Sequence, residues 1–442
     1  MYDNKKIFIL GMARSGYEAA KFLSYHNCDI LVTDGKEQDE KRVKELENLG
    51  VEVIITTNQA DLLDDTFDYV VKNPGISLYS DPCKKAMELG IPIINEMEVA
   101  YHYFPKTKIV GITGSNGKTT TTTLTYEIMK KASLPVVLGG NIGYPMCSIA
   151  KDVKENSIIL LELSAQQLQE FKEFKVDIGV LTNLSEVHLD HFKTYENYKN
   201  CKKKIFDHHN EFDVAILNAE DKDVVELTND INSNRIYFSS KTKKDLYIDD
   251  ETIYYKDEKI VDLKDIKLKG NHNYENIMCA IAIAKQFNIS NEILKEVLNT
   301  FTGVEHRLEY VKNVNGKEFY NDSKATNVDS TIIALNSFKN PTILLLGGLD
   351  RGHSFEALVP HMNNVKCVVC YGETKDRIEE FCTNNEFECY KFENLTESVK
   401  FAYEAAEKGD VILLSPACAS WDQYKCFEDR GNEFKQIINN LE

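Results

Sequence analysis

The chain has 442 residues, of which 43% are hydrophobic and 28% are charged, and its formal net charge is −18 at pH 7. This length exceeds what one hydrophobic core usually holds, so we expect two to four domains of a soluble globular protein. The negative charge would repel nucleic acid and anionic membranes, so we expect no nucleic-acid partner and no membrane partner.

The cysteines and the N-terminus indicate a reducing, cytoplasmic location. The 11 cysteines are odd in number and scattered, unlike a disulfide framework. The pair Cys367-Val-Val-Cys370 lies in an apolar run, which favours buried strand thiols over a zinc site. Residues 1–10 carry charge and then a short apolar run before Gly11, too short for a signal peptide or a membrane span.

The first third of the chain, residues 1–97, has the pattern of a Rossmann-like βαβ unit. An apolar strand over 7–10 precedes Gly11-Met-Ala-Arg-Ser-Gly16, a helix follows to about residue 25, and a second strand ends in Asp34-Gly35. Ala13 replaces the middle glycine of the dinucleotide motif, so we expect a nucleotide that need not be a nicotinamide one. Asp34 is either a ribose or base acceptor or a solvated strand-end aspartate.

A second turn of this domain follows the strand over residues 69–71. It reads Asn73-Pro-Gly75-Ile76 and belongs at the carboxyl edge of the sheet, where open α/β sheets bind ligands. Asn95 then begins a helical pattern that ends before Pro105, and we place the domain boundary near residue 98.

The central part, residues 98–302, opens with a phosphate-binding loop. The sequence Gly111-Ile-Thr-Gly-Ser-Asn-Gly-Lys-Thr-Thr120 follows an apolar strand and begins a helix. Glycines let backbone N–H groups approach phosphate oxygens, and the helix N-terminus favours anions. Lys118 would meet the β- and γ-phosphates, and the Thr119 hydroxyl would meet Mg²⁺.

Polar residues follow the later strands of this part. Gly139-Gly-Asn-Ile-Gly143 is a second glycine-rich turn, and the apolar strand over 158–161 ends in Glu162, placed to hold Mg²⁺. His188 and His191 could suggest zinc, but no third ligand has convincing spacing, so Mg²⁺ is favoured. Lys199 and residues 202–204 form what composition alone indicates to be a solvated basic helix face.

Two further elements complete the central part. The segment over 247–255 has the pattern of a hairpin. Residues 270–273 then cap an amphipathic helix over 274–287, with Asn276 in its first turn.

The last part, residues 303–442, has three strand–helix units, with strands over 342–346, 365–370 and 411–414. This pattern predicts a second Rossmann-like, mostly parallel sheet. Polar clusters over 321–327, 347–352 and 415–422 belong at strand ends, where α/β folds bind substrates, and three such loops facing one cleft would indicate a site.

These motifs resemble the Mur ligase family over the whole chain. The matching sequences are GITGSNGKTT at 111–120, GGNIG at 139–143, LELS at 161–164, HLDH at 188–191, GNHNYEN at 270–276, HR at 306–307, NDSKATN at 321–327, GGLDRG at 347–352 and SPACASWDQ at 415–423. The last three of these are similar to the members that add D-glutamate. The resemblance implies an α/β protein of three domains: N-terminal Rossmann-like, central P-loop ATPase-like and C-terminal Rossmann-like.

The resemblance also implies the reaction. ATP phosphorylates the carboxylate of UDP-N-acetylmuramoyl-L-alanine, and the amine of D-glutamate displaces phosphate from the acyl phosphate, in cytoplasmic peptidoglycan precursor synthesis. The implied cofactors are ATP and Mg²⁺, with Lys202 carbamylated so that its oxygens suit a hard cation. All partners would be small molecules, and we expect a monomer.

Individual residues are assigned by the resemblance as follows. The reacting centre would comprise Asn141, His188, Lys118 and Lys202. ATP would contact Gly114, Ser115, Asn116, Gly117, Lys118, Thr119, Thr120, Asn276, Arg307, Asp322 and Lys324. The metal would be held by Thr119, Glu162, His188 and Lys202. The UDP substrate would contact Ser15, Asp34, Gly35, Asn73, Gly75 and Asn141. D-glutamate would contact Thr326, Arg351, Ser420 and Phe427.

Three alternatives stay open at this point. One is another amide ligase of the Mur type, and another is a ligase like folylpolyglutamate synthetase, against which the Rossmann-like domain ahead of the P-loop argues. The third is a P-loop regulatory NTPase, which would not need a separate domain with an arginine-bearing carboxylate pocket. Val187, where relatives often carry aspartate, and Gly35, where some carry a hydroxyl residue, depart from the family pattern.

Overall fold

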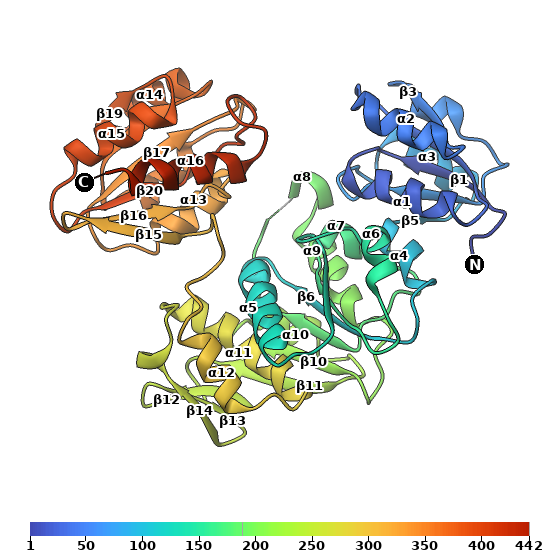
Figure 1. Ribbon diagram of the computed structural model, residues 1–442, viewed down its shortest axis with the longest axis horizontal. Coiled ribbons are helices and arrows are strands. Elements are labelled where there is room, and N and C mark those ends of the chain that lie inside the picture. The colour runs from blue at the N-terminus through green and yellow to red at the C-terminus, as the bar shows by residue number, and fades with distance from the viewer. Residues whose placement is uncertain (188, 442) are drawn as a thin grey trace. The chain divides into compact units, whose positions relative to one another are not determined.

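The computed structural model describes residues 1–187 and 189–441. In that part of the chain three β-sheets form, each packed against helices (Figure 1). The chain divides into two compact units, Met1–Phe301 with two of the sheets and Thr302–Glu442 with the third. The α/β fold predicted from the sequence is confirmed.

The first sheet is parallel throughout, with strand order β3-β2-β1-β4-β5. Its strands are β1 (Lys6–Leu10), β2 (Asp29–Asp34), β3 (Glu52–Ile55), β4 (Tyr69–Lys72) and β5 (Ile93–Ile94). Its helices are α1 (Arg14–Ser24), α2 (Glu40–Asn48), α3 (Asp81–Glu88) and α4 (Glu96–Tyr101). Because the strand order reverses between β1 and β4, the turns after these two strands lie next to each other at the carboxyl edge.

The central sheet has the order β14-β13-β12-β11-β10-β9-β6-β8-β7, parallel from β7 to β12 and antiparallel beyond it. Its strands are β6 (Lys108–Thr113), β7 (Val136–Gly140), β8 (Ile158–Glu162), β9 (Ile178–Leu181), β10 (Val214–Asn218), β11 (Asn234–Ser239), β12 (Leu246–Asp249), β13 (Thr252–Tyr255) and β14 (Glu258–Asp262). Its helices are α5 (Lys118–Lys131), α6 (Met146–Ile149), α7 (Ala165–Leu168), α8 (Leu189–Phe192), α9 (Tyr195–Lys203), α10 (Lys222–Leu227), α11 (Asn271–Gln286) and α12 (Asn291–Leu298).

Burial explains the long apolar runs of this sheet. Every residue of β8, β9 and β10 is buried, as expected for parallel strands with helices on both faces. Helix α11 packs against α5, and residues 277–284 are all buried. The helix begins at Asn271 rather than at Tyr274 as predicted, because Gly270 with φ of 108° is its N-cap, and Asn276 therefore lies beyond the first turn.

The sheet of the second unit has the order β15-β16-β20-β17-β18-β19, with β15 and β16 antiparallel and the other pairs parallel. Its strands are β15 (Glu309–Val314), β16 (Lys317–Asn321), β17 (Thr342–Gly347), β18 (Val365–Tyr371), β19 (Cys389–Lys391) and β20 (Val411–Leu414). Its helices are α13 (Val328–Leu335), α14 (Lys375–Asn384), α15 (Leu395–Ala405) and α16 (Phe427–Asn439). Cys367 and Cys370 are buried on β18, as predicted.

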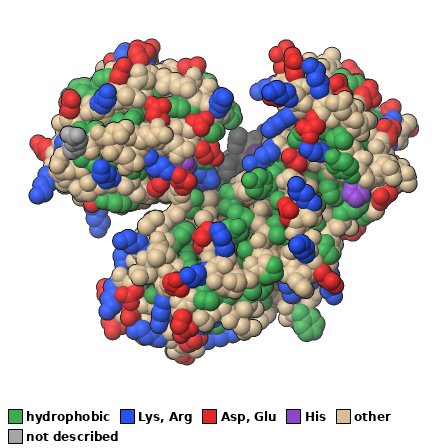
Figure 2. Space-filling view, viewed as in Figure 1, with side chains coloured by type: hydrophobic (Ala, Val, Ile, Leu, Met, Phe, Trp, Pro, Cys, Tyr) green, Lys and Arg blue, Asp and Glu red, His purple; other side chains and the backbone are tan. Residues whose placement is uncertain are grey.

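Two surface properties bear on possible partners. Among the described residues, no helix combines the length and the apolar character that crossing a lipid bilayer requires. On the face shown in Figure 2, Lys and Arg side chains are interspersed with Asp and Glu. The described residues on that face therefore form no continuous basic stripe of the kind that follows a nucleic-acid backbone.

Candidate active site

The loop between β6 and α5 has a backbone that glycine alone fits. Gly114 has a φ of 153° and Gly117 a φ of 82°. A Cβ atom would lie 1.9 Å from Thr182 Oγ1 at Gly114 and 2.1 Å from Asn276 Oδ1 at Gly117. The positive φ and the close neighbours together exclude larger residues at both positions. Asn276 therefore lies against the loop, although it follows it by more than 150 positions.

The end of β9 holds this loop in shape. Asn183 accepts the Ser115 N–H at its carbonyl (2.9 Å) and the Asn116 N–H at its side-chain oxygen (2.9 Å). The Thr182 hydroxyl donates to the Asn116 carbonyl at 2.6 Å. Three hydrogen bonds thus fix the loop from the neighbouring strand.

Lys118, the first residue of α5, folds back over the loop. Its Nζ donates to the carbonyls of Gly114 (2.8 Å) and Ser115 (2.9 Å). No side chain in the described part of the chain caps the start of α5, and Thr119 and Thr120 in its first turn are buried. An ammonium group and a helix N-terminus therefore lie at one end of the loop, an arrangement that favours an anionic phosphate.

Lys202 on α9 is buried directly beside the loop. It is 1% exposed, its Nζ donates to Thr113 Oγ1 at 3.1 Å, and it lies 5.0 Å from the centre of the Tyr198 ring. Burial holds the pKa of Lys202 well below its usual range, and the positive charge of Lys118 lowers it further. The unprotonated amine, which is the form that can act as a nucleophile, is therefore favoured over its usual proportion in a lysine side chain. Tyr198 also joins the loop, through a 2.9 Å contact with Ser115 Oγ.

A buried carboxylate lies at the end of β8. Glu162 is 1% exposed, and its Oε1 accepts a hydrogen bond from Asn141 Nδ2 at 2.7 Å. Its Oε2 has no hydrogen-bond partner among the described residues. The Asn141 N–H also donates to the Glu162 carbonyl at 2.8 Å, so the second glycine-rich turn is fixed to this strand end.

The donor set at this position fits a hard cation such as Mg²⁺. It offers the unpartnered Glu162 oxygen, which is an oxygen donor. Among the described residues, no three His, Cys, Asp or Glu side chains gather to hold a metal ion. A further ligand predicted from the sequence, His188, lies outside the described residues.

The turns after β1 and β4 meet, as the strand order requires. Asn73 Nδ2 donates to Ser15 Oγ at 2.9 Å, and Asn73 Oδ1 accepts the Gly75 N–H at 3.0 Å. Asp34 Oδ2 accepts the Met12 N–H at 2.8 Å, so its carboxylate holds the first turn. Four of the residues predicted to contact the UDP substrate thus gather at one edge of the sheet.

The remaining substrate candidate in this turn region is Gly35. A Cβ atom built there would have nothing within 4 Å. The space beside Gly35 is therefore open, and a ligand group could approach its backbone.

A buried ion pair supports the turn after β4. Lys72 Nζ lies 3.1 Å from Glu170 Oε1, and the two side chains are 0% and 1% exposed. Lys72 Nζ also donates to the carbonyls of Asn73 (3.1 Å) and Ile76 (2.7 Å). Burial raises the pKa of Glu170 to about 7, and the charge of Lys72 opposes that shift.

Replacing Lys72 by Met is expected to lower the free energy of unfolding by about 3–5 kcal/mol at pH 8, because Glu170 would stay buried without its partner. The loss should be smaller at pH 5. A carboxyl whose pKa is raised by folding binds its proton more tightly in the native state, so stability falls as pH rises from the unfolded pKa toward the native one.

Urea unfolding followed by circular dichroism measures this effect. Lys84→Met breaks the exposed pair with Asp81 and should change the free energy of unfolding by less than about 1 kcal/mol. A Lys72→Met variant as stable as that control at both pH values would contradict the prediction. The double variant Lys72→Met/Glu170→Met should recover part of the loss.

In the second unit, one buried arginine joins the three polar loops. Arg430 on α16 is 0% exposed. Its Nε donates to Ser323 Oγ at 3.0 Å, and its Nη2 donates to the carbonyls of Ser323 (2.9 Å) and Cys418 (3.0 Å). Its Nη1 lies 3.4 Å from the carbonyl of Gly347. The loops predicted to face one cleft are therefore held together at their bases.

Two segments meet here: the loop after β16 carries the buried acid Asp322, and the segment before β15 carries Arg307 on a constrained backbone. Asp322 accepts the Leu308 N–H at 3.1 Å and the Ser415 hydroxyl at 2.8 Å. Burial raises the pKa of Asp322 to about 7, against the effects of Ser415 and Arg307. His306 and Leu308 have φ values of 62° and 45°. Non-glycine residues are uncommon at such angles, which often occur at functional sites.

The other predicted residues of this unit lie on these loops or, in the case of Phe427, at the start of α16. Lys324 Nζ lies 5.7 Å from the centre of the Phe427 ring. Thr326 follows on the same loop, and Ser420 is buried in the loop after β20. Phe427 is the first residue of α16, which no side chain of the described residues caps, so its N–H belongs to the helix's free amide end. The side chain of Arg351 is exposed in the loop after β17.

Comparison with known proteins identifies the family. The Mur ligase MurD-like N-terminal domain matches residues 5–95, the Mur ligase middle domain 112–284, and the Mur ligase glutamate ligase domain 306–418. UDP-N-acetylmuramoylalanine–D-glutamate ligase of Geobacillus sp. (strain WCH70) is 44% identical over 446 residues, covering 100% of this chain and 98% of that protein. The same-named protein of Bacillus cereus (strain G9842) is 44% identical over 445 residues, with the same coverage.

The chain belongs to the Mur ligase family.

Solved Mur ligase structures share the fold. UDP-N-acetylmuramate–alanine ligase MurC of Thermotoga maritima superposes with a TM-score of 0.62 at 19% identity, over 99% of this chain and 100% of that one. The MurF ligase of Thermotoga maritima, solved in complex with ADP, superposes with a TM-score of 0.59 at 18% identity, over 93% and 95% of the two chains. The resemblance stated from the sequence motifs is confirmed.

Residues that sequence reasoning left without a role also shape this Mur ligase site. Asn183, just after the end of β9, holds the phosphate-binding loop. No role was predicted for Arg430 from the sequence. In the structure, α16 buries Arg430 on one face together with Gly431, Phe434 and Ile438. A charged residue within an apolar helical stripe is the sequence signal that would have found it. Lys72, at the end of an apolar strand run, carries a similar signal.

Proposed function

We propose that this chain is an ATP-dependent ligase that joins D-glutamate to UDP-N-acetylmuramoyl-L-alanine in the synthesis of peptidoglycan precursors. The observation that carries the proposal is 44% identity, along the full chain, to relatives named for that reaction. The Mur ligase family is ATP-dependent, and the constrained loop with its ammonium group and helix N-terminus suits a triphosphate.

The first chemical step is transfer of the γ-phosphoryl group to the substrate carboxylate. A carboxylate oxygen forms a bond to phosphorus, the bond to the ADP oxygen breaks, and ADP leaves. Lys118 would move from its loop carbonyls to the phosphates and offset the charge on the transferring group. The product is an acyl phosphate with a far better leaving group than oxide.

Lys202 is proposed to carry a carbamate. The neutral amine attacks CO₂, a nitrogen–carbon bond forms, and the nitrogen loses a proton to solvent. Its depressed pKa supports this reaction, because only an unprotonated amine has the free electron pair. The carbamate would add two oxygen donors to those of Thr119 and Glu162, with His188 as a further ligand. Mg²⁺ held there would neutralise phosphate charge.

The second step joins the amino acid. The unprotonated amine of D-glutamate attacks the acyl carbon, its nitrogen loses a proton to solvent, the tetrahedral intermediate expels phosphate, and an amide forms. Asn141, held beside Glu162, is proposed to contact the muramoyl-alanine part. The remaining assignments also stay proposals: nucleotide contacts by Asn276, Arg307, Asp322 and Lys324, UDP contacts by Ser15, Asp34, Gly35, Asn73 and Gly75, and D-glutamate contacts by Thr326, Arg351, Ser420 and the Phe427 backbone.

A phosphate-release assay tests the proposal directly. The full chain, with ATP, Mg²⁺ and UDP-N-acetylmuramoyl-L-alanine, should release phosphate when D-glutamate is added, and much more slowly with L-glutamate, diaminopimelate or D-alanine. Release that another amino acid supports better would indicate a different amide ligase. Release that ignores every amino acid would favour a regulatory NTPase.

Two properties follow from the proposed substrates. ATP and the UDP-linked precursor are cytoplasmic metabolites, so we propose a cytoplasmic enzyme. We also propose that it acts as a monomer, since one chain carries every residue assigned to the reaction. Sedimentation at working concentration checks the second point, and a stable dimer would contradict it.

A further inference from the structure

The single tryptophan of the chain lies on the surface of the second unit. Trp421 follows Ser420 in the loop after β20, and its side chain is 63% exposed. The carbon at the centre of the Arg351 guanidinium lies 4.9 Å from the centre of its ring. This distance is within the range of a cation–π contact.

The contact follows from the way two loops run beside each other. The Leu349 N–H donates to the Ala419 carbonyl at 2.9 Å, one loop supplying the donor and the other the acceptor. Arg430 joins the bases of both loops through Gly347 and Cys418. Two positions further along each loop stand Arg351 and Trp421. The pairing of these two side chains is therefore set by backbone hydrogen bonds and a buried arginine.

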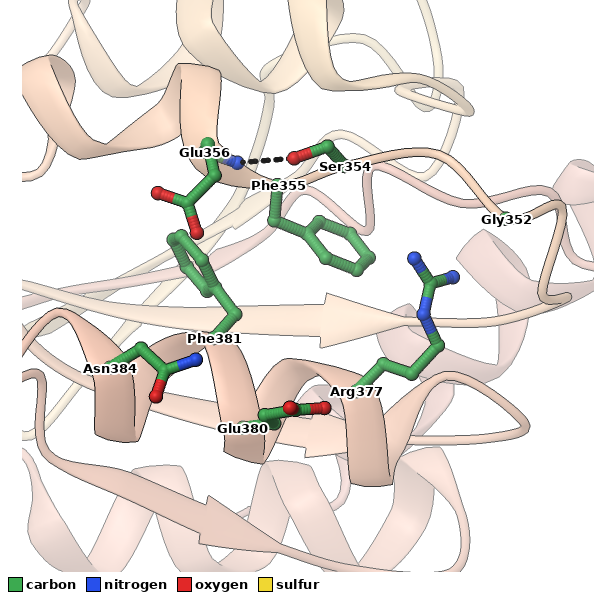
Figure 3. Close-up of a pocket in the computed structure, with 8 residues that line it drawn as sticks. All are labelled: Gly352, Ser354, Phe355, Glu356, Arg377, Glu380, Phe381 and Asn384. Atoms are coloured by element: carbon green, nitrogen blue, oxygen red, sulfur yellow. Dashed lines mark hydrogen bonds between the residues drawn. The ribbon is translucent and has the colours of Figure 1, made fainter.

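The neighbouring acid does not compete for Arg351. Asp350 is paired with Arg377 of α14, and its Oδ1 also accepts the Gly352 N–H at 2.8 Å. Arg377 donates further to the His353 carbonyl at 2.8 Å, so it holds the backbone on both sides of Arg351. Figure 3 shows Arg377 extending from its helix toward the segment that contains Gly352.

The Arg351 guanidinium keeps its hydrogen-bonding capacity. Among the residues that the structure describes, it forms no hydrogen bond and no ion pair with a protein group, and its contact is the indole ring. A ring stacked on the face of a guanidinium leaves the N–H groups at the edge free, and these match a carboxylate in a bidentate manner. An arginine on an exposed loop would otherwise lose side-chain freedom when it binds.

We propose that Trp421 is a positioning residue that holds Arg351 ready for the side-chain carboxylate of the incoming amino acid. This inference rests on the proposed function, in which Arg351 and Ser420 contact D-glutamate. The ring acts before the ligand arrives, by restricting the guanidinium. Trp421 thereby contributes to the choice of a diacid over an amino acid with a neutral side chain.

Steady-state kinetics of three variants test the proposal. Trp421→Leu keeps apolar bulk and removes the π face, and should raise the KM for D-glutamate about three- to fivefold, with kcat and the KM for ATP unchanged. Trp421→Phe retains a ring and should stay within about twofold of the parent. Tyr310→Leu removes another exposed aromatic residue of the same unit, on β15. It should leave the KM for D-glutamate, the KM for ATP and kcat unchanged.

The intrinsic fluorescence of the sole tryptophan gives a second readout. In the parent, adding D-glutamate with ADP and the UDP substrate present should change the emission, because the guanidinium above the ring becomes paired. In Arg351→Ala that change should be lost. A Trp421→Leu variant with an unchanged KM for D-glutamate, or an equal rise in the KM for ATP, would overturn the inference. If instead the parent released no phosphate with D-glutamate, the proposed function itself would fail.

Discussion

Lys202→Ala is expected to lower turnover by at least about 10²-fold, and a short-chain carboxylate such as acetate should restore part of the loss. The side chain is buried beside Thr113, and its removal opens a space next to the phosphate-binding loop. A small carboxylate entering that space would supply the two oxygen atoms that the carbamate is proposed to provide.

The neighbouring lysine offers a matched control. Lys203 is on the same helix but pairs with Asp230 at the surface, so Lys203→Ala should keep near-parental turnover and show no response to acetate. Sodium chloride at the same concentration controls for ionic strength. Full activity of Lys202→Ala without any additive would exclude the carbamate, and rescue of Lys203→Ala instead would place it one residue further along.

Lys118→Ala is expected to lower kcat by at least about 10³-fold while weakening ADP binding far less, by about tenfold. The difference arises because Lys118 has partners within the protein, the carbonyls of Gly114 and Ser115. Binding exchanges those hydrogen bonds for contacts with phosphate, which limits the net gain in affinity. The negative charge that develops on the transferring phosphoryl group would have no substitute for the Lys118 ammonium in the variant, so the loss should appear mainly in kcat.

Phosphate release gives kcat for this comparison, and titration calorimetry gives the affinity for ADP. Lys131→Ala is the matched control, because Lys131 ends the same helix in a surface pair with Glu296 and should leave both quantities unchanged. Equal losses in kcat and in ADP affinity would show that Lys118 contributes to binding alone. An active Lys118→Ala variant would show that this loop does not hold ATP.

The parts of the fold that the sequence predicted well are those where one pattern dominates. The apolar run 158–161 could only be a buried strand, and β8 covers it and ends at Glu162, as expected. The glycine-rich loop was also predicted correctly, because the positions of Gly114 and Gly117 leave no room for a larger side chain. Polar loops were predicted at strand ends because the βαβ order makes the strands parallel. The structure has such loops at strand ends in all three sheets.

The parts that were missed depend on partners distant in sequence. The hairpin of β15 and β16 is rich in Lys, Glu and Asn, so no apolar alternation marks it, and β19 has only three residues. The role of Arg430 depends on three loops that share no sequence signal with α16. The ion pair of Lys72 and Glu170 joins residues almost a hundred positions apart, so the apolar run before Lys72 indicates its burial but not its partner.

The hydrogen bonds from Asn183 to the phosphate-binding loop have a thermodynamic consequence. Because these hydrogen bonds order the turn when the chain folds, much of its conformational entropy is lost once, and a ligand that binds there need not order it again. If ATP binds here as proposed, the exchange of ADP for ATP would require little rearrangement of the turn beyond the Lys118 side chain. This would suit an enzyme that must release ADP in every cycle.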